Sequence, residues 1–152
     1  MIEFYVDGSC PGNPGPGGYA IVVLKDGEVV RKMGGRKRKS SNNEMELMAV
    51  LESLKYVDRK QKIFANENIN IYSDSQYVVA GINKWMECWR QNNWRTYFNN
   101  LVKHKPIWEA MYEYINKYPN VKIVKVKGHS ADLYNDLADK LAREQANYWG
   151  VV

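Results

Sequence analysis

Ile2, Phe4 and Val6 alternate with Glu3 and Tyr5 near the N-terminus, as in a strand that buries one face. Two further strands are expected at 19–24 and 28–33. The last two are joined through Lys25-Asp26-Gly27, which contains a pair preferred in hairpin turns. We therefore expect three consecutive strands paired antiparallel. The stretch through Lys39 either extends the third strand or forms its exit loop.

Helical spacing of apolar residues alternates with short strand patterns along the rest of the chain. Residues 59–68 are polar and irregular, as in a connecting loop, and strands are expected at 69–74 and 121–126. Helices are expected at 44–58, from Ser75, at 107–118 and from about Asn135. This order of elements is typical of an α/β fold.

The helix from Ser75 carries Val78, Ile82, Trp85 and Trp89 on one stripe. We expect these tryptophans to pack in the core first and to contact nucleic acid second. Farther along, Trp94, Tyr97 and Phe98 are interleaved with basic residues. We expect residues 90–105 to form a basic, aromatic protrusion rather than core, suited to phosphates and sugar faces.

The composition is ordinary for a soluble globular protein: 152 residues, of which 45% are hydrophobic and 26% charged. We expect a single domain over 1–152. Cys10 and Cys88 lack a Cys-x-x-Cys spacing, which argues against a disulfide framework or a structural zinc site. A strand pattern at the first residues leaves no room for a signal peptide, and no apolar run is long enough to span a membrane. A cytoplasmic location without a membrane partner is expected.

Positive charge is clustered within a net charge of +5. Six basic residues and no acid lie between Arg31 and Lys39. Basic clusters beside aromatic residues indicate a nucleic-acid-binding protein, although a solvated basic surface is the plain alternative.

Two carboxylates stand where strands end. Asp7 follows the first strand and precedes a turn dense in glycine and proline, and Asp74 ends the strand at 69–74. Strand ends are where open α/β sheets bind ligands. The structural alternatives are a hairpin-turn residue for Asp7 and a helix N-cap for Asp74.

Two further carboxylates lie on helices. Glu46 falls at the margin of a buried stripe, although Asn43 and Glu46 also resemble a capping box. Asp139 shares a stripe with small residues of the last helix, whereas Asp136 is spaced to pair with Lys140 in solvent. His129, in a loop after the last strand, is a further candidate.

Four adjacent carboxylates could not all stay ionised without cations, because like charges raise one another's pKa. A set of oxygen ligands indicates magnesium or manganese rather than zinc. Two such ions about 4 Å apart are suited to in-line attack on a phosphodiester.

The motifs together resemble type 1 ribonuclease H, of the bacterial ribonuclease HI kind with a basic protrusion. The matching segments, in family order, are Asp7-Gly-Ser-Cys-x-Gly-Asn-Pro-Gly-Pro-Gly-Gly, Asn42-Asn43-x-Met-Glu46-Leu, Ser73-Asp74-Ser-Gln76-Tyr-Val, Lys127-Gly-His129, and Asn135 with Asp139-x-Leu-Ala. The resemblance implies a ribonuclease H-like fold: a five-stranded mixed sheet, three antiparallel strands then two parallel, with helices on both faces.

The resemblance also implies a function, hydrolysis of the RNA strand of RNA/DNA hybrids to leave 3′-hydroxyl and 5′-phosphate ends. Two Mg²⁺ ions, for which Mn²⁺ can substitute, would be held by Asp7, Glu46, Asp74 and Asp139. His129 would assist turnover by proton transfer or product release. Residues expected to contact the hybrid are Cys10, Asn13, Asn42, Asn43, Gln76, Trp85, Trp94 and Asn135. A monomer is expected.

Two other functions fit parts of the pattern. A catalytically silent hybrid-binding module would use the same basic frame, but four carboxylates weaken phosphate binding unless metal offsets them. A DNA-directed relative, such as an integrase or junction resolvase, would keep the fold and the metals. Asn42, Asn43 and Gln76 favour RNA, because in the family such positions contact the 2′-hydroxyl groups that distinguish RNA from DNA.

Overall fold

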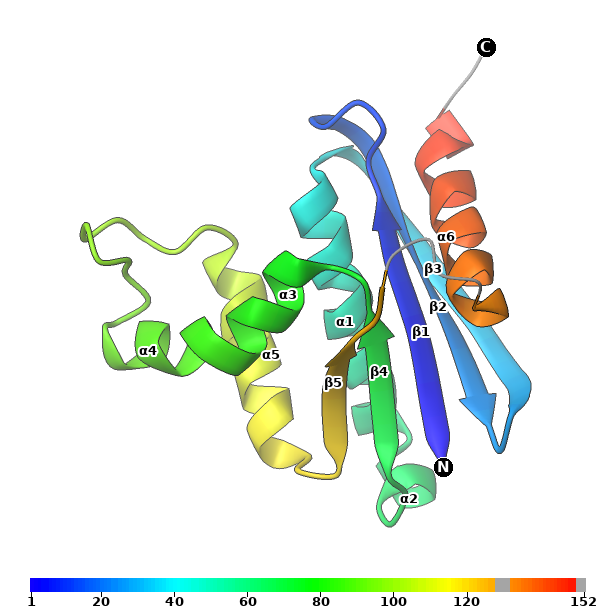
Figure 1. Ribbon diagram of the computed structural model, residues 1–152. Coiled ribbons are helices and arrows are strands. Elements are labelled where there is room, and N and C mark those ends of the chain that lie inside the picture. Colours follow the sequence, from blue (N-terminus) through cyan, green and yellow to red (C-terminus); the bar gives the residue numbers. More distant parts are fainter. Residues whose placement is uncertain (128–131, 150–152) are drawn as a thin grey trace.

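The computed structural model describes residues 1–127 and 132–149 (Figure 1). Its strands are β1 (Ile2–Ser9), β2 (Gly15–Lys25), β3 (Glu28–Ser40), β4 (Ile69–Ser73) and β5 (Val121–Lys125). Its helices are α1 (Asn42–Arg59), α2 (Gln61–Phe64), α3 (Gln76–Ala80), the π-helical η1 (Gly81–Trp85), α4 (Met86–Gln91), α5 (Lys105–Lys117), α6 (Leu133–Ala146) and the 3₁₀ turn η2 (Asn147–Trp149).

The five strands form one mixed sheet in the order β3-β2-β1-β4-β5. β1 and β2 pair antiparallel, as do β2 and β3, whereas β4 runs parallel to both β1 and β5. The predicted arrangement of three antiparallel strands followed by two parallel ones is confirmed. Because β1 and β4 are parallel neighbours, their carboxyl ends meet at the same edge of the sheet.

Helices cover both faces of the sheet (Figure 1). Phe4 and Val6 of β1 pack with α1 and α5 in the larger core, where Trp108 of α5 is fully buried. On the other face Tyr5 and Leu24 pack against Ala138 of α6. Alternate side chains of β1 therefore pack into the two hydrophobic cores on opposite faces of the sheet. Within the described ranges, no helix is both long enough and apolar enough to cross a membrane.

Several predicted boundaries shift in the structure. The basic stretch through Lys39 continues β3, and the expected loop at 59–68 contains the short helix α2. Helix α1 begins at Asn42 because the Ser41 side chain accepts a hydrogen bond from the Glu44 amide. The capping interpretation of Asn43 is therefore wrong.

The tryptophan assignments are partly wrong. The π-helical turn η1 takes one more residue per turn than an α-helix, so Met86 is buried and Trp85 is 52% exposed. Trp94, expected on the protrusion, is buried and packs edge-to-face with Tyr112 of α5. An indole ring gains more from that apolar contact than from exposure to water.

Candidate functional site

Asp7 lies near the end of β1, opposite Ala20 of β2, and is only 5% exposed. Asp74 follows β4 directly, because that strand ends at Ser73. The parallel pairing of β1 and β4 therefore brings two carboxylates from distant parts of the sequence to one sheet edge. Asp74 is not the N-cap of the next helix, because Ser75 caps it by accepting from the Val78 amide.

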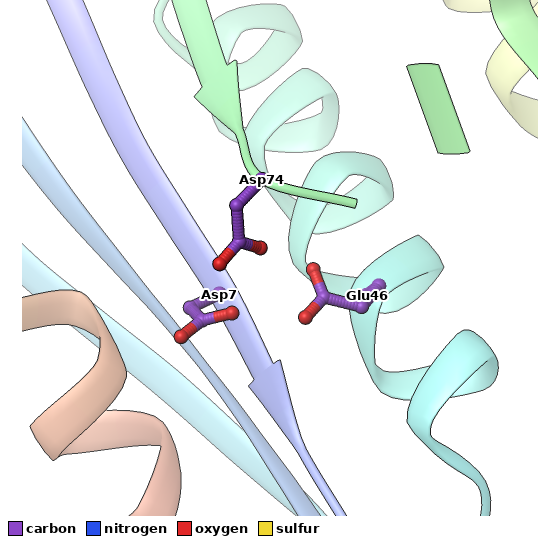
Figure 2. Close-up of side chains that lie close together, drawn as sticks. All are labelled: Asp7, Glu46 and Asp74. Atoms are coloured by element: carbon purple, nitrogen blue, oxygen red, sulfur yellow. The ribbon is translucent and has the colours of Figure 1, made fainter. Parts of the chain in front are cut away.

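Helix α1 brings Glu46 to the same edge. Its carboxylate Oε1 accepts a hydrogen bond from the Gly8 amide at 3.1 Å, and the same amide donates to Oδ1 of Asp7 at 2.9 Å. The helix can approach this closely because residue 8 has no side chain. Figure 2 shows the carboxyl groups of Asp7, Glu46 and Asp74 directed toward one another.

One carboxylate oxygen from each of these three residues lies within 4.8 Å of the corresponding oxygens of the other two. Burial, with repulsion from Asp74, raises the pKa of Asp7 to about 7. Burial also raises the pKa of Glu46 well above its usual range, and the charges of Asp7 and Asp74 add to that shift. Crowded, desolvated carboxylates of this kind are costly as anions unless a cation is bound.

The fourth predicted carboxylate, Asp139 on α6, lies beside Asp7 and contributes to its raised pKa. It is also held by Arg143 one turn along the helix, with 3.0 Å between Oδ2 and the guanidinium nitrogen. Asp136 is exposed, in agreement with its predicted position on the solvent side of the helix. The predicted ion pair was misplaced, because α6 pairs Asp139 rather than Asp136 with a cation at i+4.

The cluster has the properties of a site for a hard divalent cation. Its donors are all carboxylate oxygens, which magnesium and manganese prefer. Oε2 of Glu46 is buried and has no hydrogen-bond partner among the described residues. A buried polar atom without a partner is unfavourable, and a bound cation would satisfy it.

The loop between β1 and β2 is docked on the start of α1. The Cys10 backbone amide donates to the side-chain Oδ1 of Asn42 at 2.9 Å. The Asn42 backbone amide in turn donates to the side-chain Oδ1 of Asn13 at 3.0 Å. The Cys10 thiol is buried and donates to the Gly15 and Ser40 carbonyls, so it lies within the loop's framework rather than at its surface. These bonds place Asn13 and Asn42, both exposed, side by side.

The other predicted contact residues differ in accessibility. Asn43 and Gln76 are exposed, at the start of α1 and of α3. Asn135 lies one turn before Asp139 and is buried, and within the described ranges its Oδ1 has no hydrogen-bond partner. His129 lies outside the described residues, so its predicted role stays a prediction.

Sequence reasoning missed two residues that shape this site. Gly8 was noted only as part of a glycine-rich turn, yet it lies in β1 and permits the contact with Glu46. Arg143 was not considered as a partner of Asp139, although its spacing of four residues from Asp139 was the signal for the observed ion pair.

Comparison with known proteins points to one family. A family model described as RNase H matches residues 1–147. The chain is 42% identical over 146 residues to a Ribonuclease H of Thermoanaerobacter sp., covering 95% of this chain and 89% of that protein. It is 39% identical over 142 residues to a Ribonuclease H of Neorickettsia sennetsu, covering 93% and 90% of the two chains.

Solved structures show the same fold. LC9-RNase H1, a type 1 RNase H with the type 2 active-site motif, matches with a TM-score of 0.80 and 26% identity, covering 96% of this chain and 72% of that one. LC11-RNase H1 in complex with an RNA/DNA hybrid matches with a TM-score of 0.76 and 19% identity, covering 97% of each chain. At that lower identity the likeness concerns the fold alone.

Proposed function

Because this chain belongs to the ribonuclease H family, we propose that it is a metal-dependent endonuclease that hydrolyses the RNA strand of RNA/DNA hybrids. The products would carry 3′-hydroxyl and 5′-phosphate ends. The observation that carries the proposal is the cluster of Asp7, Glu46 and Asp74, whose oxygens lie within 4.8 Å of one another. A silent binding module would have no use for carboxylates that repel phosphate.

Asp7, Glu46 and Asp74 would hold divalent cations, Mg²⁺ or in its place Mn²⁺, with Asp139 as a further ligand. Two bound cations would supply an activated water and charge stabilisation at the scissile phosphodiester. The protein's own contribution is to hold the carboxylates in a partly desolvated position, where the Gly8 amide orients Asp7 and Glu46. Arg143 keeps Asp139 directed along α6. His129 would assist turnover by proton transfer or product release.

Recognition of RNA is assigned to the exposed amides around the cluster. Asn13 of the docked loop is a neighbour of Asn42 at the start of α1. Asn43 follows in the same turn of α1, and Gln76 lies at the start of α3. Amide groups can both donate to and accept from a 2′-hydroxyl, which DNA lacks. Trp85, which is 52% exposed, would contact the DNA strand. The similarity to proteins named Ribonuclease H at 42% and 39% identity supports a substrate that contains RNA.

The test is a cleavage assay on an end-labelled RNA annealed to DNA, with Mg²⁺ or with EDTA. The same RNA in an RNA/RNA duplex and a DNA duplex serve as matched substrates. We expect metal-dependent cleavage of the hybrid's RNA strand alone. Binding without cleavage in both Mg²⁺ and Mn²⁺ would contradict the proposed activity, and cleavage of the DNA duplex would contradict the proposed substrate.

A further inference from the structure

Two aromatic side chains stand in solvent at the tip of the segment between α4 and α5. Tyr97 is 94% exposed and Phe98 is 81% exposed, and their rings meet edge-to-face with centroids 5.2 Å apart. Single exposed apolar residues are common on protein surfaces, but two adjacent aromatic rings that are both largely exposed to water are unusual. A partner that covers the rings would account for their exposure.

The tip is a closed turn rather than a loose loop. Arg95 and Leu101 pair as an antiparallel bridge, and the Thr96 amide donates to the Asn100 carbonyl at 2.8 Å. The Arg95 guanidinium also donates to the Asn99 carbonyl. The buried Trp94 anchors this turn to α5 through its contact with Tyr112. The backbone therefore holds the two rings outward without help from the ring atoms themselves.

A hollow of about 510 Å³ lies between this tip and α4. Trp85, Trp89, Tyr97 and Phe98 line it, together with Arg95. Aromatic surface thus comes from both sides of the hollow, and the cationic side chain of Arg95 forms part of its lining. Figure 1 shows that α4 and the segment after it extend away from the sheet, on the side of α3 and α5.

The basic and aromatic residues around the hollow indicate what kind of molecule it binds. Residues 90–105 contain no acidic residue, and Arg95, Lys103 and Lys105 add positive charge there, whereas Arg90 is paired with Glu87 of α4. The net positive charge attracts a polyanion. Aromatic side chains in a basic groove stack on nucleobases. Inside a duplex the faces of the bases are covered by their neighbours, so only an unpaired base can offer its face to such rings.

We propose that this hollow binds unpaired bases of a single-stranded DNA extension adjoining the hybrid, with Tyr97 and Phe98 as stacking residues. The inference rests on the proposed function, because it requires a hybrid seated at the carboxylate cluster. The two strands of that hybrid are chemically distinct, so the cluster fixes their direction. An extension of one polarity alone would then reach the tip.

Binding experiments with the Asp74→Asn variant, which should bind without cleaving, test this site. The substrates are a short blunt hybrid and the same hybrid with a DNA extension of a few nucleotides at either the 5′ or the 3′ end. We expect one extension to tighten binding by on the order of tenfold. 2-Aminopurine in that extension should lose fluorescence on binding, as stacked bases do.

Adding Tyr97→Ser and Phe98→Ser should abolish both the gain and the quenching. Both side chains are exposed and outside the core, so the fold should persist. Leu101→Ser is the matched control, because Leu101 is 57% exposed on the same turn and does not line the hollow. It should keep both signals.

Equal affinity for the three substrates, an equal gain from both polarities, or a gain that survives the double substitution would overturn the inference. An apolar segment of a protein partner as the true occupant would give the first of these results. Failure of the unmodified protein to cleave the blunt hybrid would instead overturn the proposed function, so the two failures are distinguishable.

Discussion

The Gly8 amide donates to the Glu46 carboxylate at 3.1 Å, and a side chain at Gly8 would place its Cβ 2.5 Å from the Glu46 backbone nitrogen. Strand β1 and helix α1 therefore touch through backbone atoms at the point where each contributes a carboxylate. The spacing of the proposed metal ligands depends on this contact, since any wider separation would move Glu46 away from Asp7.

Gly8→Ala should lower the free energy of unfolding by about 1–3 kcal/mol, because backbone atoms must shift to admit the methyl group. Urea denaturation measures that loss, and hybrid cleavage should fall with it. Gly27→Ala is the control: no atom lies within 4 Å of its Cβ position, but its φ of 86° is unfavourable for alanine. It should cost about 1 kcal/mol through backbone strain and leave cleavage unchanged. Similar cleavage by both variants would mean that the close contact between β1 and α1 does not determine the spacing of the proposed metal ligands.

Asp74→Asn should reduce the rate of hybrid cleavage by on the order of 10³-fold or more, because a lost metal ligand removes several kcal/mol of transition-state stabilisation. Hybrid binding, measured by fluorescence anisotropy, should remain detectable. Asp136→Asn makes the same change of charge at an exposed position of α6 and should leave the rate within about twofold. A comparable rate for Asp74→Asn would remove this residue from the catalytic site.

His129→Ala should slow turnover much less than Asp74→Asn, since water can replace part of a histidine's proton-transfer assistance, whereas nothing replaces a lost metal ligand. Single-turnover and steady-state rates separate cleavage from product release. Complete loss of cleavage by the histidine variant would show that its role is more than assistance.

Local patterns selected four carboxylates as candidates for a site, although Asp7, Glu46 and Asp74 each kept a structural alternative. Alternation in β1 and β4 showed that Asp7 and Asp74 stand at strand ends, and helical phase separated Glu46 and Asp139 from other acids. Each inference needed only the period of one element. The parallel pairing of β1 and β4 then brings Asp7 and Asp74 to one edge.

Features that depend on contacts between elements were not predictable in this way. Trp108 packs directly beside Gly81, where a Cβ would clash with the indole ring, and the π-helical turn η1 begins at this glycine. Helical spacing extrapolated through η1 therefore assigned Trp85 to the core in place of Met86. The burial of Trp94 likewise depends on Tyr112, which lies on a different helix.

Ser41→Ala should lower the free energy of unfolding by about 1 kcal/mol, because the Glu44 amide loses the side-chain acceptor that caps α1. Asn43→Ala should change stability by less than about 0.5 kcal/mol, since Asn43 is exposed within the first turn. Urea denaturation of the two variants distinguishes the caps, and a larger loss for the Asn43 variant would restore the interpretation that the structure contradicts.

Without metal, stability should fall as the pH rises through the range in which Asp7 titrates. The pKa of Asp7 is raised by burial from 3.8 to about 7, so between these values the folded protein retains a proton that the unfolded chain has lost. The free energy of unfolding must then decrease with rising pH across that window and remain low above it. The raised pKa of Glu46 acts in the same direction.

Asp7→Asn removes the Asp7 contribution, so in EDTA the variant should gain on the order of 2–4 kcal/mol relative to the unmodified protein between about pH 4 and pH 8. Urea denaturation across this range measures the difference. Mg²⁺ at about pH 8 should stabilise the unmodified protein more than the variant, since cations bind the ionised cluster of the folded state. If the free energies of unfolding of the two proteins in EDTA changed with pH in parallel, Asp7 would not be a carboxylate whose pKa is raised by folding.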